Sequence, residues 1–519
     1  MRTNLIFKAL STLLSGLIAC YANGEDYKWS SNVYTPQTGF LGYFSSPEEA
    51  CQKYIDSYMV IYEHPGQKAH DLKVIPNSYY QGRFDCSVLV DWPPSRQYDP
   101  PQLREFTANR TGDTCPAGTE YIPSTGCEST NKESTHKKLG MPSQFDGCNS
   151  GTSSFVGNPI NLTNGNKVQR EIDYAALNSP LLKYERFYNS AALQWTGSFT
   201  DRLILGGSTV SLIRSDLSEV LFKKTASDYL SEPPSKGKLT YANGKWSYLS
   251  PDNTTFIFDS WGKLIAIQKT NAPALTVTYV NDTNLNVTDS NGQNLKVSRD
   301  RLGNPLLLEA PGLQVEYIYN GYTNIRSAKF TRAGATTSKT YKYFNNNTGY
   351  LTKTIDEKGN SFASWTYDES GKAISSEHAL GAEKVLLSYN TDGSTTLSNG
   401  YEKQTTYRFQ LINGIKRITS IEGAPSQTCP YSNSTFTYDI QGLMTSYTDA
   451  KGNLTSYDYD DRGLETSRTE ASGTAQARTV TTEWHPTLFL KTKVTEPDRI
   501  TTYQYDTQGR QTGQIVTPR

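Results

Sequence analysis

Residues 438–463 contain the pattern that decides the fold, YDIQGLMTSYTDAKGNLTSYDYDDRG. Two Tyr-Asp-x-x-Gly turns, at Tyr438 and Tyr459, stand 21 residues apart, and a further turn over residues 449–453 lies between them. Asp bonds to the backbone two residues on and Gly accepts a positive φ, so both residues favour tight turns. A unit of about 22 residues with two turns predicts one β-hairpin.

The same spacing recurs through the second half of the chain. An aromatic residue at an expected strand end repeats at intervals of 20 to 29 residues, at Phe258, Tyr279, Tyr319, Tyr343, Tyr367, Tyr389, Phe409, Tyr438, Tyr459, Trp484 and Tyr505. A degenerate copy at Arg299 fills the one longer gap, which gives twelve units. We expect each tyrosine to pack its ring on a neighbouring hairpin and to keep its hydroxyl at a wet or hydrogen-bonded edge. One hairpin cannot bury its own face, so the copies should pair edge to edge.

Composition supports this reading and excludes other classes of protein. The 519 residues carry 51 basic and 51 acidic side chains, so net charge gives no reason to bind nucleic acid or an anionic membrane. Aromatic residues make up 12% of the chain, which argues against disorder, and 35 of them are tyrosine, which suits a pleated surface. Short alternating runs follow residue 155, and no long helical pattern follows residue 180. The predicted fold is mainly β.

Residues 1–22 have the features of a secretory signal peptide. Arg2 and Lys8 give a positive start, and residues 10–19 form an apolar run too short to span a bilayer, which takes about 20 residues. The run ends in Leu-Ile-Ala-Cys20, which resembles a bacterial lipobox with Cys20 as the lipidated residue. Ordinary cleavage after Ala22 is the alternative. Both interpretations predict export, to the cell envelope as an outer-membrane lipoprotein or as a secreted protein.

Six cysteines remain after removal of the signal, and an oxidising compartment makes disulfides the default. They are Cys51, Cys86, Cys115, Cys127, Cys148 and Cys429. The preferred pairs among the 15 possible pairings are Cys51–Cys86 and Cys115–Cys127, with Cys148 joined to Cys429 or free. A zinc site is the weaker alternative, because no Cys-x-x-Cys is present and the histidines are scattered.

The chain divides into four expected segments after the signal. Residues 27–100 form a small α+β disulfide domain with a helix from the Ser46-Pro47 start to about Tyr58 and extended segments near Tyr79 and over residues 86–90. Residues 101–154 are a Cys-containing linker. Residues 155–255 form a β domain, and residues 256–519 hold the repeats.

The repeats resemble the YD repeats of bacterial Rhs proteins, of the polymorphic-toxin type. The leading segment is similar to the domain that commonly precedes those repeats, at Gly157-Asn158-Pro159-Ile160-Asn161, Gly165-Asn166-Lys167, Asp173-Tyr174, Pro180-Leu181 and Arg186-Phe187-Tyr188-Asn189-Ser190. The resemblance covers residues 155–519. It implies a long β-strip that winds into a hollow shell, which in longer members encloses a C-terminal toxin.

The sequence departs from that family at its C-terminal side. No Asp-Pro-x-Gly segment is present, and no toxin-like segment follows Tyr505. Self-cleavage and toxin activity are therefore not expected of this chain. Twelve hairpins are few for a closed shell, so an open, curved sheet with unpaired edge strands is predicted. The expected partners are a C-terminal toxin or a second Rhs chain.

No motif for catalysis or for a cofactor is present, including Gly-x-Ser-x-Gly, His-Glu-x-x-His and the nucleotide-binding glycine loops. The chain is expected to be non-enzymatic and to need no cofactor or metal. Asp458, Asp460 and Asp461 cluster on a repeat turn, where turn chemistry is favoured over calcium. His378 and His485 are isolated among the repeats and are expected to be solvated or structural.

The aromatic residues allow one alternative function. Rows of tyrosine and tryptophan can stack on sugar rings, and Trp365 and Trp484 offer the largest flat faces. Core and cross-strand packing is the competing interpretation of the same residues. The leading hypothesis is an exported scaffold that resembles the N-terminal shell part of a polymorphic toxin without its effector. The alternative is a surface module that binds carbohydrate or a neighbouring cell.

Overall fold

The computed structural model of the chain describes residues 28–31, 47–61, 68–76, 83–91, 102–111, 119–129, 132–134, 137, 139–141 and 154–519, the last range without residues 207, 226–227, 233–236, 301–302, 322–323, 345–348 and 424–432. The chain has two compact units, Met1–Thr130 and Asn131–Arg519. Strand makes up 61% of the structure, which confirms the mainly β prediction. The predicted signal peptide and Cys20 lie outside the described residues. Within those residues, no helix has both the length and the apolar character needed to cross a membrane.

The first unit contains a four-stranded antiparallel sheet in the order β1-β4-β3-β2, one α-helix and a hairpin. Its elements are β1 (Lys28–Ser31), α2 (Pro47–Ile61), β2 (Lys68–Pro76), β3 (Arg83–Asp91), β4 (Gln102–Thr111), β5 (Thr119–Ile122) and β6 (Gly126–Ser129). The predicted helix is present and continues three residues beyond Tyr58. The sheet extends past residue 100, because β4 pairs with both β3 and β1. The first part of the predicted linker is therefore a strand of this sheet.

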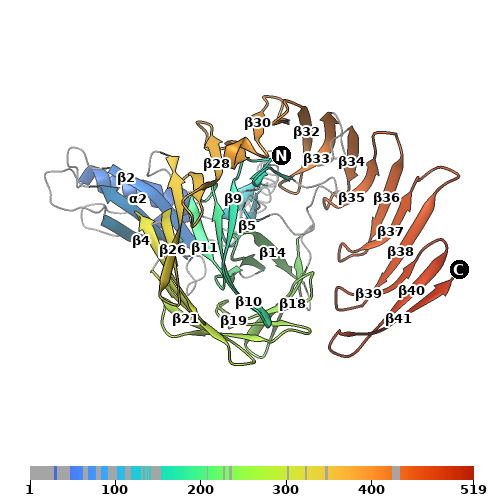
Figure 1. Ribbon diagram of the computed structural model, residues 1–519, viewed down its shortest axis with the longest axis horizontal. Coiled ribbons are helices and arrows are strands. Elements are labelled where there is room, and N and C mark those ends of the chain that lie inside the picture. Colours follow the sequence, from blue (N-terminus) through green and yellow to red (C-terminus); the bar gives the residue numbers. More distant parts are fainter. Residues whose placement is uncertain are drawn as a thin grey trace, which may run out of the picture. The chain divides into compact units, whose positions relative to one another are not determined.

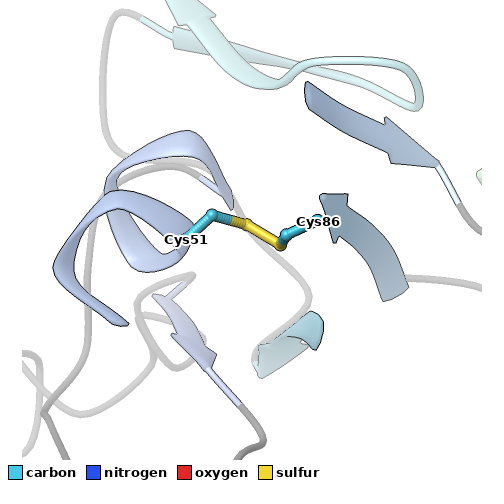
Figure 2. Close-up of a disulfide and its surroundings, with 2 residues drawn as sticks. All are labelled: Cys51 and Cys86. Carbon is cyan, nitrogen blue, oxygen red and sulfur yellow. A yellow bond between two sulfur atoms is a disulfide. The ribbon is translucent and has the colours of Figure 1, made fainter. Parts of the chain in front are cut away.

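The predicted Cys51–Cys86 disulfide joins α2 to β3 (Figure 2). Ala50, Cys51, Tyr54 and Ile55 form the buried face of the helix, one turn apart, and pack with alternate residues of β3. The bridge lies in this small core, so it crosslinks the two elements that supply most of its apolar side chains. Cys127 is also disulfide-bonded. Cys115, Cys148 and Cys429 lie outside the described residues, so the other predicted pairings stay predictions.

The second unit holds two short strands, a three-stranded sheet and a long sheet. The short strands are β7 (Phe155–Val156) and β8 (Ile160–Asn161), and the three-stranded sheet consists of β9 (Val168–Ala176), β10 (Ser179–Asn189) and β11 (Gln194–Gly197). We call β9–β11 the inner sheet. The long sheet has 30 strands, and each is hydrogen-bonded to the next along the sequence.

The strands of the long sheet are β12 (Arg202–Gly206), β13 (Thr209–Ile213), β14 (Glu219–Lys224), β15 (Tyr229–Ser231), β16 (Lys238–Ala242), β17 (Lys245–Leu249), β18 (Thr254–Phe258), β19 (Leu264–Lys269), β20 (Leu275–Tyr279), β21 (Asn284–Asp289), β22 (Asn294–Arg299), β23 (Pro305–Ala310), β24 (Leu313–Asn320), β25 (Asn324–Arg332), β26 (Ala335–Tyr343), β27 (Leu351–Ile355), β28 (Ser361–Tyr367), β29 (Ala373–His378), β30 (Val385–Tyr389), β31 (Thr395–Asn399), β32 (Gln404–Ile412), β33 (Ile415–Gly423), β34 (Ser434–Tyr438), β35 (Met444–Thr448), β36 (Leu454–Tyr459), β37 (Glu465–Glu470), β38 (Arg478–Trp484), β39 (Lys491–Thr495), β40 (Arg499–Tyr505) and β41 (Gln511–Pro518). A 3₁₀ turn, η3 (Ala379–Gly381), lies between the paired strands β29 and β30.

The turns use the chemistry that the repeat predicts. In the turn between β28 and β29, Asp368 Oδ1 accepts the N–H groups of Ser370 at 2.9 Å and Lys372 at 3.0 Å. Gly371 has a φ of 80°, which a residue with a side chain rarely adopts. Asp356 holds Lys358 and Asn360 in the same way at the opposite edge of the sheet. At both edges of the sheet, turns are therefore stabilised by hydrogen bonds from their own backbone N–H groups to an aspartate side chain.

A second repeated bond joins each hairpin to the one before it. Tyr367 pairs with Ala373, whereas Thr366 pairs with Ser375, so a β-bulge lies beside the turn. The Tyr389 hydroxyl, from the next hairpin, donates to the Ala373 carbonyl at 2.7 Å. In the described sheet the same bond occurs from eight aromatic side chains, at Tyr319–Pro305, Tyr343–Ile325, Tyr367–Leu351, Tyr389–Ala373, Tyr438–Ile418, Tyr459–Met444, Trp484–Glu465 and Tyr505–Lys491. At these eight positions, the aromatic residue that repeats in the sequence is thus the donor to a backbone carbonyl beside a bulge.

The long sheet is open, as predicted, because β12 and β41 are its two ends and do not pair. It nevertheless curls back on itself. The amide group of Asn253, in the turn after β17, accepts the N–H of Phe489 at 2.8 Å and donates to its carbonyl at 3.1 Å. Thr270, in the next turn along the same edge, donates to the Gln508 carbonyl at 3.0 Å. Turns 236 and 238 residues apart therefore meet, and we call this contact the seam.

The two ends of the long sheet differ. The outer edge of β12 is covered, because Leu203 donates its N–H to the Gly262 carbonyl at 2.9 Å and Arg202 forms a β-bridge with Lys263. Among the described residues, no strand pairs with the outer edge of β41, and most of its residues are exposed. Figure 1 shows the first part of the sheet curving around the inner sheet. The main apolar cluster lies between the two and includes Leu182, Tyr188 and Trp195 on the inner side.

We expect Tyr389→Phe to lower the free energy of unfolding by about 1–3 kcal/mol, because it leaves the buried carbonyl of Ala373 without its donor. Urea-induced unfolding of the full chain measures the change. Tyr401→Phe is the matched control, since Tyr401 lies at a turn and is 88% exposed, and it should leave the midpoint unchanged. Equal effects of the two variants would contradict the proposed role of the bond.

We expect Cys51→Ser to destabilise the first unit by about 2–5 kcal/mol, because it removes a crosslink between residues 35 positions apart. Proteolytic cleavage within residues 47–91 of the full chain, followed by mass spectrometry, reports the change. The double variant Cys51→Ser/Cys86→Ser should behave as the single variant does. Free thiols at both positions in the exported protein would show that the crosslink does not form.

Candidate functional site

The inner sheet is held on the long sheet by a buried ion pair. Arg186 of β10 and Asp173 of β9 are both inaccessible, and the guanidinium donates to the carboxylate from Nε at 2.5 Å and from Nη2 at 2.9 Å. Tyr341 of β26 accepts a bond from Arg186 at 2.9 Å, and the Tyr317 hydroxyl of β24 donates to Asp173 at 2.7 Å. Each buried charge therefore has partners on both sheets.

Aromatic rings surround the same guanidinium. Trp195, Tyr317 and Tyr341 place their ring centroids 5.0, 5.0 and 5.3 Å from the Arg186 carbon, within the range of cation–π attraction. Burial lowers the pKa of Arg186, but Asp173 and the tyrosines outweigh burial and hold it above its usual value. Arg186 is therefore a permanent buried cation that fixes the inner sheet against β24 and β26.

A buried lysine forms a second anchor. The Lys167 ammonium nitrogen lies 2.9 Å from Gln169 Oε1 and also bonds to the Val168 carbonyl. It lies 4.1 Å from the centroid of the Trp365 ring, in β28. Burial lowers the pKa of Lys167 well below its usual value, and the nearby Glu171 opposes part of that effect.

The structure corrects the sugar-stacking prediction for Trp365. Its side chain is 2% exposed, Lys167 covers its ring, and its indole N–H donates to the Asn158 carbonyl at 2.7 Å. The residue packs in the core because the leading segment covers this part of the long sheet. Trp484 is half-buried, and its indole N–H donates to the Glu465 carbonyl at 2.9 Å, in the position that tyrosine occupies in other repeats. Both tryptophans therefore have structural contacts that account for them.

The acidic cluster at residues 458–461 behaves as a turn. Asp460 Oδ1 accepts the N–H groups of Arg462 at 3.0 Å and Leu464 at 2.8 Å. The described residues contain no group of three or more His, Cys, Asp or Glu side chains suited to a metal ion.

A cavity of about 430 Å³ lies between the leading segment and the strands near β33. Lys137 and Lys416 line it, but each forms an ion pair, with Glu232 at 2.7 Å and Glu133 at 3.3 Å. Both lysines are therefore engaged within the protein, and Arg417 of β33 also lines the cavity.

Sequence reasoning missed the central pair. Asp173 and Arg186 belong to the leading segment that carries the family resemblance, but their role depends on tyrosines 144 and 155 residues away. The usable signal is local, since Arg186 lies among the aromatic residues Tyr184, Phe187 and Tyr188 of one strand. A charge in such a strand indicates a buried partner.

Two family models match the chain. Residues 157–222 match a domain described as a domain of unknown function (DUF6531), and residues 381–483 match the teneurin YD-shell. The first match contains the inner sheet with Asp173 and Arg186, and the second contains the repeats from η3 to β38. Together with the period of the hairpins, these matches support an Rhs/YD-repeat protein. No curated protein matches the sequence.

Several solved structures share a likeness with the chain. The TcdB2-TccC3 protein without its hypervariable C-terminal region is 11% identical with a TM-score of 0.29, over 66% of this chain and 19% of that one. TcdB2-TccC3 itself is 10% identical with a TM-score of 0.29, over 84% and 23%. The Tc holotoxin pore of Photorhabdus luminescens is 8% identical with a TM-score of 0.35, over 66% and 23%. The chain thus spans about a fifth of the length of these structures.

We expect Arg186→Met to destabilise the second unit by about 3–5 kcal/mol, because it leaves Asp173 buried without its counter-charge. Unfolding in urea, followed by tryptophan fluorescence, measures the loss. Arg408→Met is the control, since Arg408 forms an exposed pair with Glu422 at 2.7 Å, and the midpoint should not move. If Arg408→Met costs as much as Arg186→Met, the buried pair is not the anchor.

Proposed function

We propose that the protein is an exported, non-enzymatic Rhs-type scaffold that resembles the N-terminal shell part of a polymorphic toxin and combines with a further component. The observation that carries the proposal is the open end of the long sheet. β12 is covered by the turn at Gly262, whereas among the described residues no strand pairs with the outer edge of β41. The scaffold is therefore suited to continue in one direction.

The outer edge of β41 has the features needed to pair with one more hairpin. Tyr505 pairs with Gln511 beside a bulge, as the eight capped positions do. The Gln511 carbonyl thus stands where the next aromatic donor would bind. β41 has no charged side chain, and charges are a usual means of blocking an edge. We infer that the partner supplies an antiparallel strand followed by a YD-type tyrosine or tryptophan.

The late strands have room for such a partner. Many strands before β34, such as β21, have a buried face, whereas β35 and β37 are only partly buried and β41 is largely exposed. A partner that extends the sheet would also cover these faces. A toxin component or a second Rhs chain would meet this description. Carbohydrate binding has less support, because Trp365 and Trp484 are engaged within the protein.

Export is proposed from the first 22 residues, with the lipid anchor at Cys20 and ordinary cleavage as the two forms. Intact mass of the native exported product distinguishes them, because acylation adds the mass of fatty acids to a chain that begins at Cys20. An unprocessed product confined to the cytosol would overturn this part of the proposal.

The test of the scaffold compares β41 in two samples, the native exported product and a chain of residues 1–519 produced alone. We expect hydrogen exchange at β41 to be slow in the native product and fast in the chain produced alone. β33 serves as the internal control and should be equally slow in both. Ile515→Lys should abolish the difference, because a charge at the edge opposes strand pairing. Fast exchange of β41 in both samples, or glycan-array binding by the chain alone, would overturn the proposal.

A further inference from the structure

One of the turns that form the seam has a different first residue from the corresponding turns of the neighbouring repeats. The turn between β38 and β39 starts at His485, in the position that Asp460 and Asp506 occupy in the neighbouring repeats. His485 Nδ1 accepts the backbone N–H of Thr487 at 3.2 Å and of Leu488 at 3.1 Å. An imidazole nitrogen thus replaces the carboxylate oxygen that holds the other turns.

The bonds fix the protonation state that the turn requires. A backbone N–H can only donate, so Nδ1 of His485 must be unprotonated for both bonds to exist. A carboxylate keeps its acceptor oxygens through the mildly acidic range, whereas imidazoles as a class gain a proton between about pH 8 and 5. Of the turns that start at Asp460, His485 and Asp506, the His485 turn is therefore the one that can lose its side-chain acceptor on mild acidification.

The next residues of the same turn make the seam. Phe489 bonds to Asn253 through both its N–H, at 2.8 Å, and its carbonyl, at 3.1 Å. Leu488 and Leu490 approach Gly509 in the following turn, whose Gln508 carbonyl binds Thr270. A change in the His485 turn therefore acts directly on the residues that join the two parts of the sheet.

A cation beside the turn opposes a second positive charge. Arg462, from the turn between β36 and β37, donates to the carbonyls of His485 at 2.9 Å and Pro486 at 3.3 Å. Its charge is partly balanced by Asp460, at 3.1 Å. Lys491, from β39, lies 5.7 Å from the Trp484 ring. Two cations and one carboxylate therefore lie close to the His485 turn.

The acidic groups on the adjoining elements are already paired. Across the seam, Asp252 binds Lys269 at 2.7 Å. Partial burial raises the pKa of Asp252, but hydrogen bonds from Lys269, Ser250 and Thr254 outweigh it and lower the value to about 2. Asp506 binds Arg510 at 2.5 Å, and the bonds it accepts in its turn lower its pKa. Both carboxylates stay ionised at pH 5, so neither supplies an acid transition there.

We propose that the seam is a latch that opens on mild acidification, with His485 as its proton sensor. Protonation of Nδ1 removes the acceptor of two backbone bonds, the turn loses its shape, and the two-point contact between Phe489 and Asn253 breaks. The closed seam binds only the neutral imidazole, so its stability is complete at neutral pH and falls as the pH falls. The strands from β35 onward then separate from the first part of the sheet.

The population ratio of the closed to the open seam is the quantity that the proposal expects to fall between pH 7.5 and pH 5. Hydrogen exchange of the full chain at pH 7.5 and pH 5, with each rate divided by the intrinsic rate at that pH, measures this ratio. Residues 250–254 and 485–490 are expected to lose at least about tenfold in protection at pH 5.

Three variants separate the latch from general acid sensitivity. His485→Asp restores the acceptor of the other repeats and should keep the seam protected at both pH values. Asn253→Ala should leave it unprotected at both. His378→Gln changes a histidine at the end of β29 and should behave as the unaltered chain. Strand β13, which is buried throughout, is the internal reference and should keep its protection.

Three results would overturn the proposal. Unchanged protection of the seam at pH 5 in the unaltered chain would show that His485 is not a sensor. Loss of protection in His485→Asp would assign the transition to another group. Simultaneous loss at β13 would show that the whole sheet unfolds. These readouts do not depend on a partner at β41, so they fail or succeed separately from the scaffold proposal.

Discussion

At eight positions of the long sheet, a hydrogen bond from an aromatic side chain to the bulge carbonyl of the preceding hairpin couples one repeat to its neighbour. A bulge beside a turn bends the strand and removes one carbonyl from the ladder. In a sheet of 30 strands that defect would recur at every second strand, so its compensation must recur too. Tyrosine provides the donor and covers the adjacent apolar surface with its ring. One residue type thus permits curvature without a buried unsatisfied group.

Curvature in turn creates the need for the inner sheet. A curved strip has one face toward its own interior, and the apolar side chains there need a partner surface. β9–β11 supply that surface over the first part of the strip, and the buried Arg186–Asp173 pair fixes their position through its bonds to Tyr341 and Tyr317 of the long sheet. The late strands lack such a cover among the described residues, which accounts for their partial burial.

The sequence indicates the local features of this fold and not its distant contacts. Tyr438 and Asp439 predict a hairpin, its turn and a bonded hydroxyl, because each depends on residues within one repeat. The Cys51–Cys86 bridge could also be predicted, because both cysteines lie in one short segment of the chain with few other cysteines near them. Periodicity gives the alternation of faces and does not say which face another segment covers, so for Trp365 it allows both core packing and sugar stacking. β4 was read as linker because its pairing partners lie outside its own segment. The Asn253–Phe489 contact depends on the summed twist of the strands between them, which no short pattern encodes.

The unequal ends of the long sheet limit how the protein can assemble. A strip with two free edges could add copies at both and grow into a fibre. Here the turn at Gly262 occupies part of the β12 edge, so strand addition is opposed at that end of the sheet. The covered end therefore acts as a terminator for growth of the sheet beyond β12.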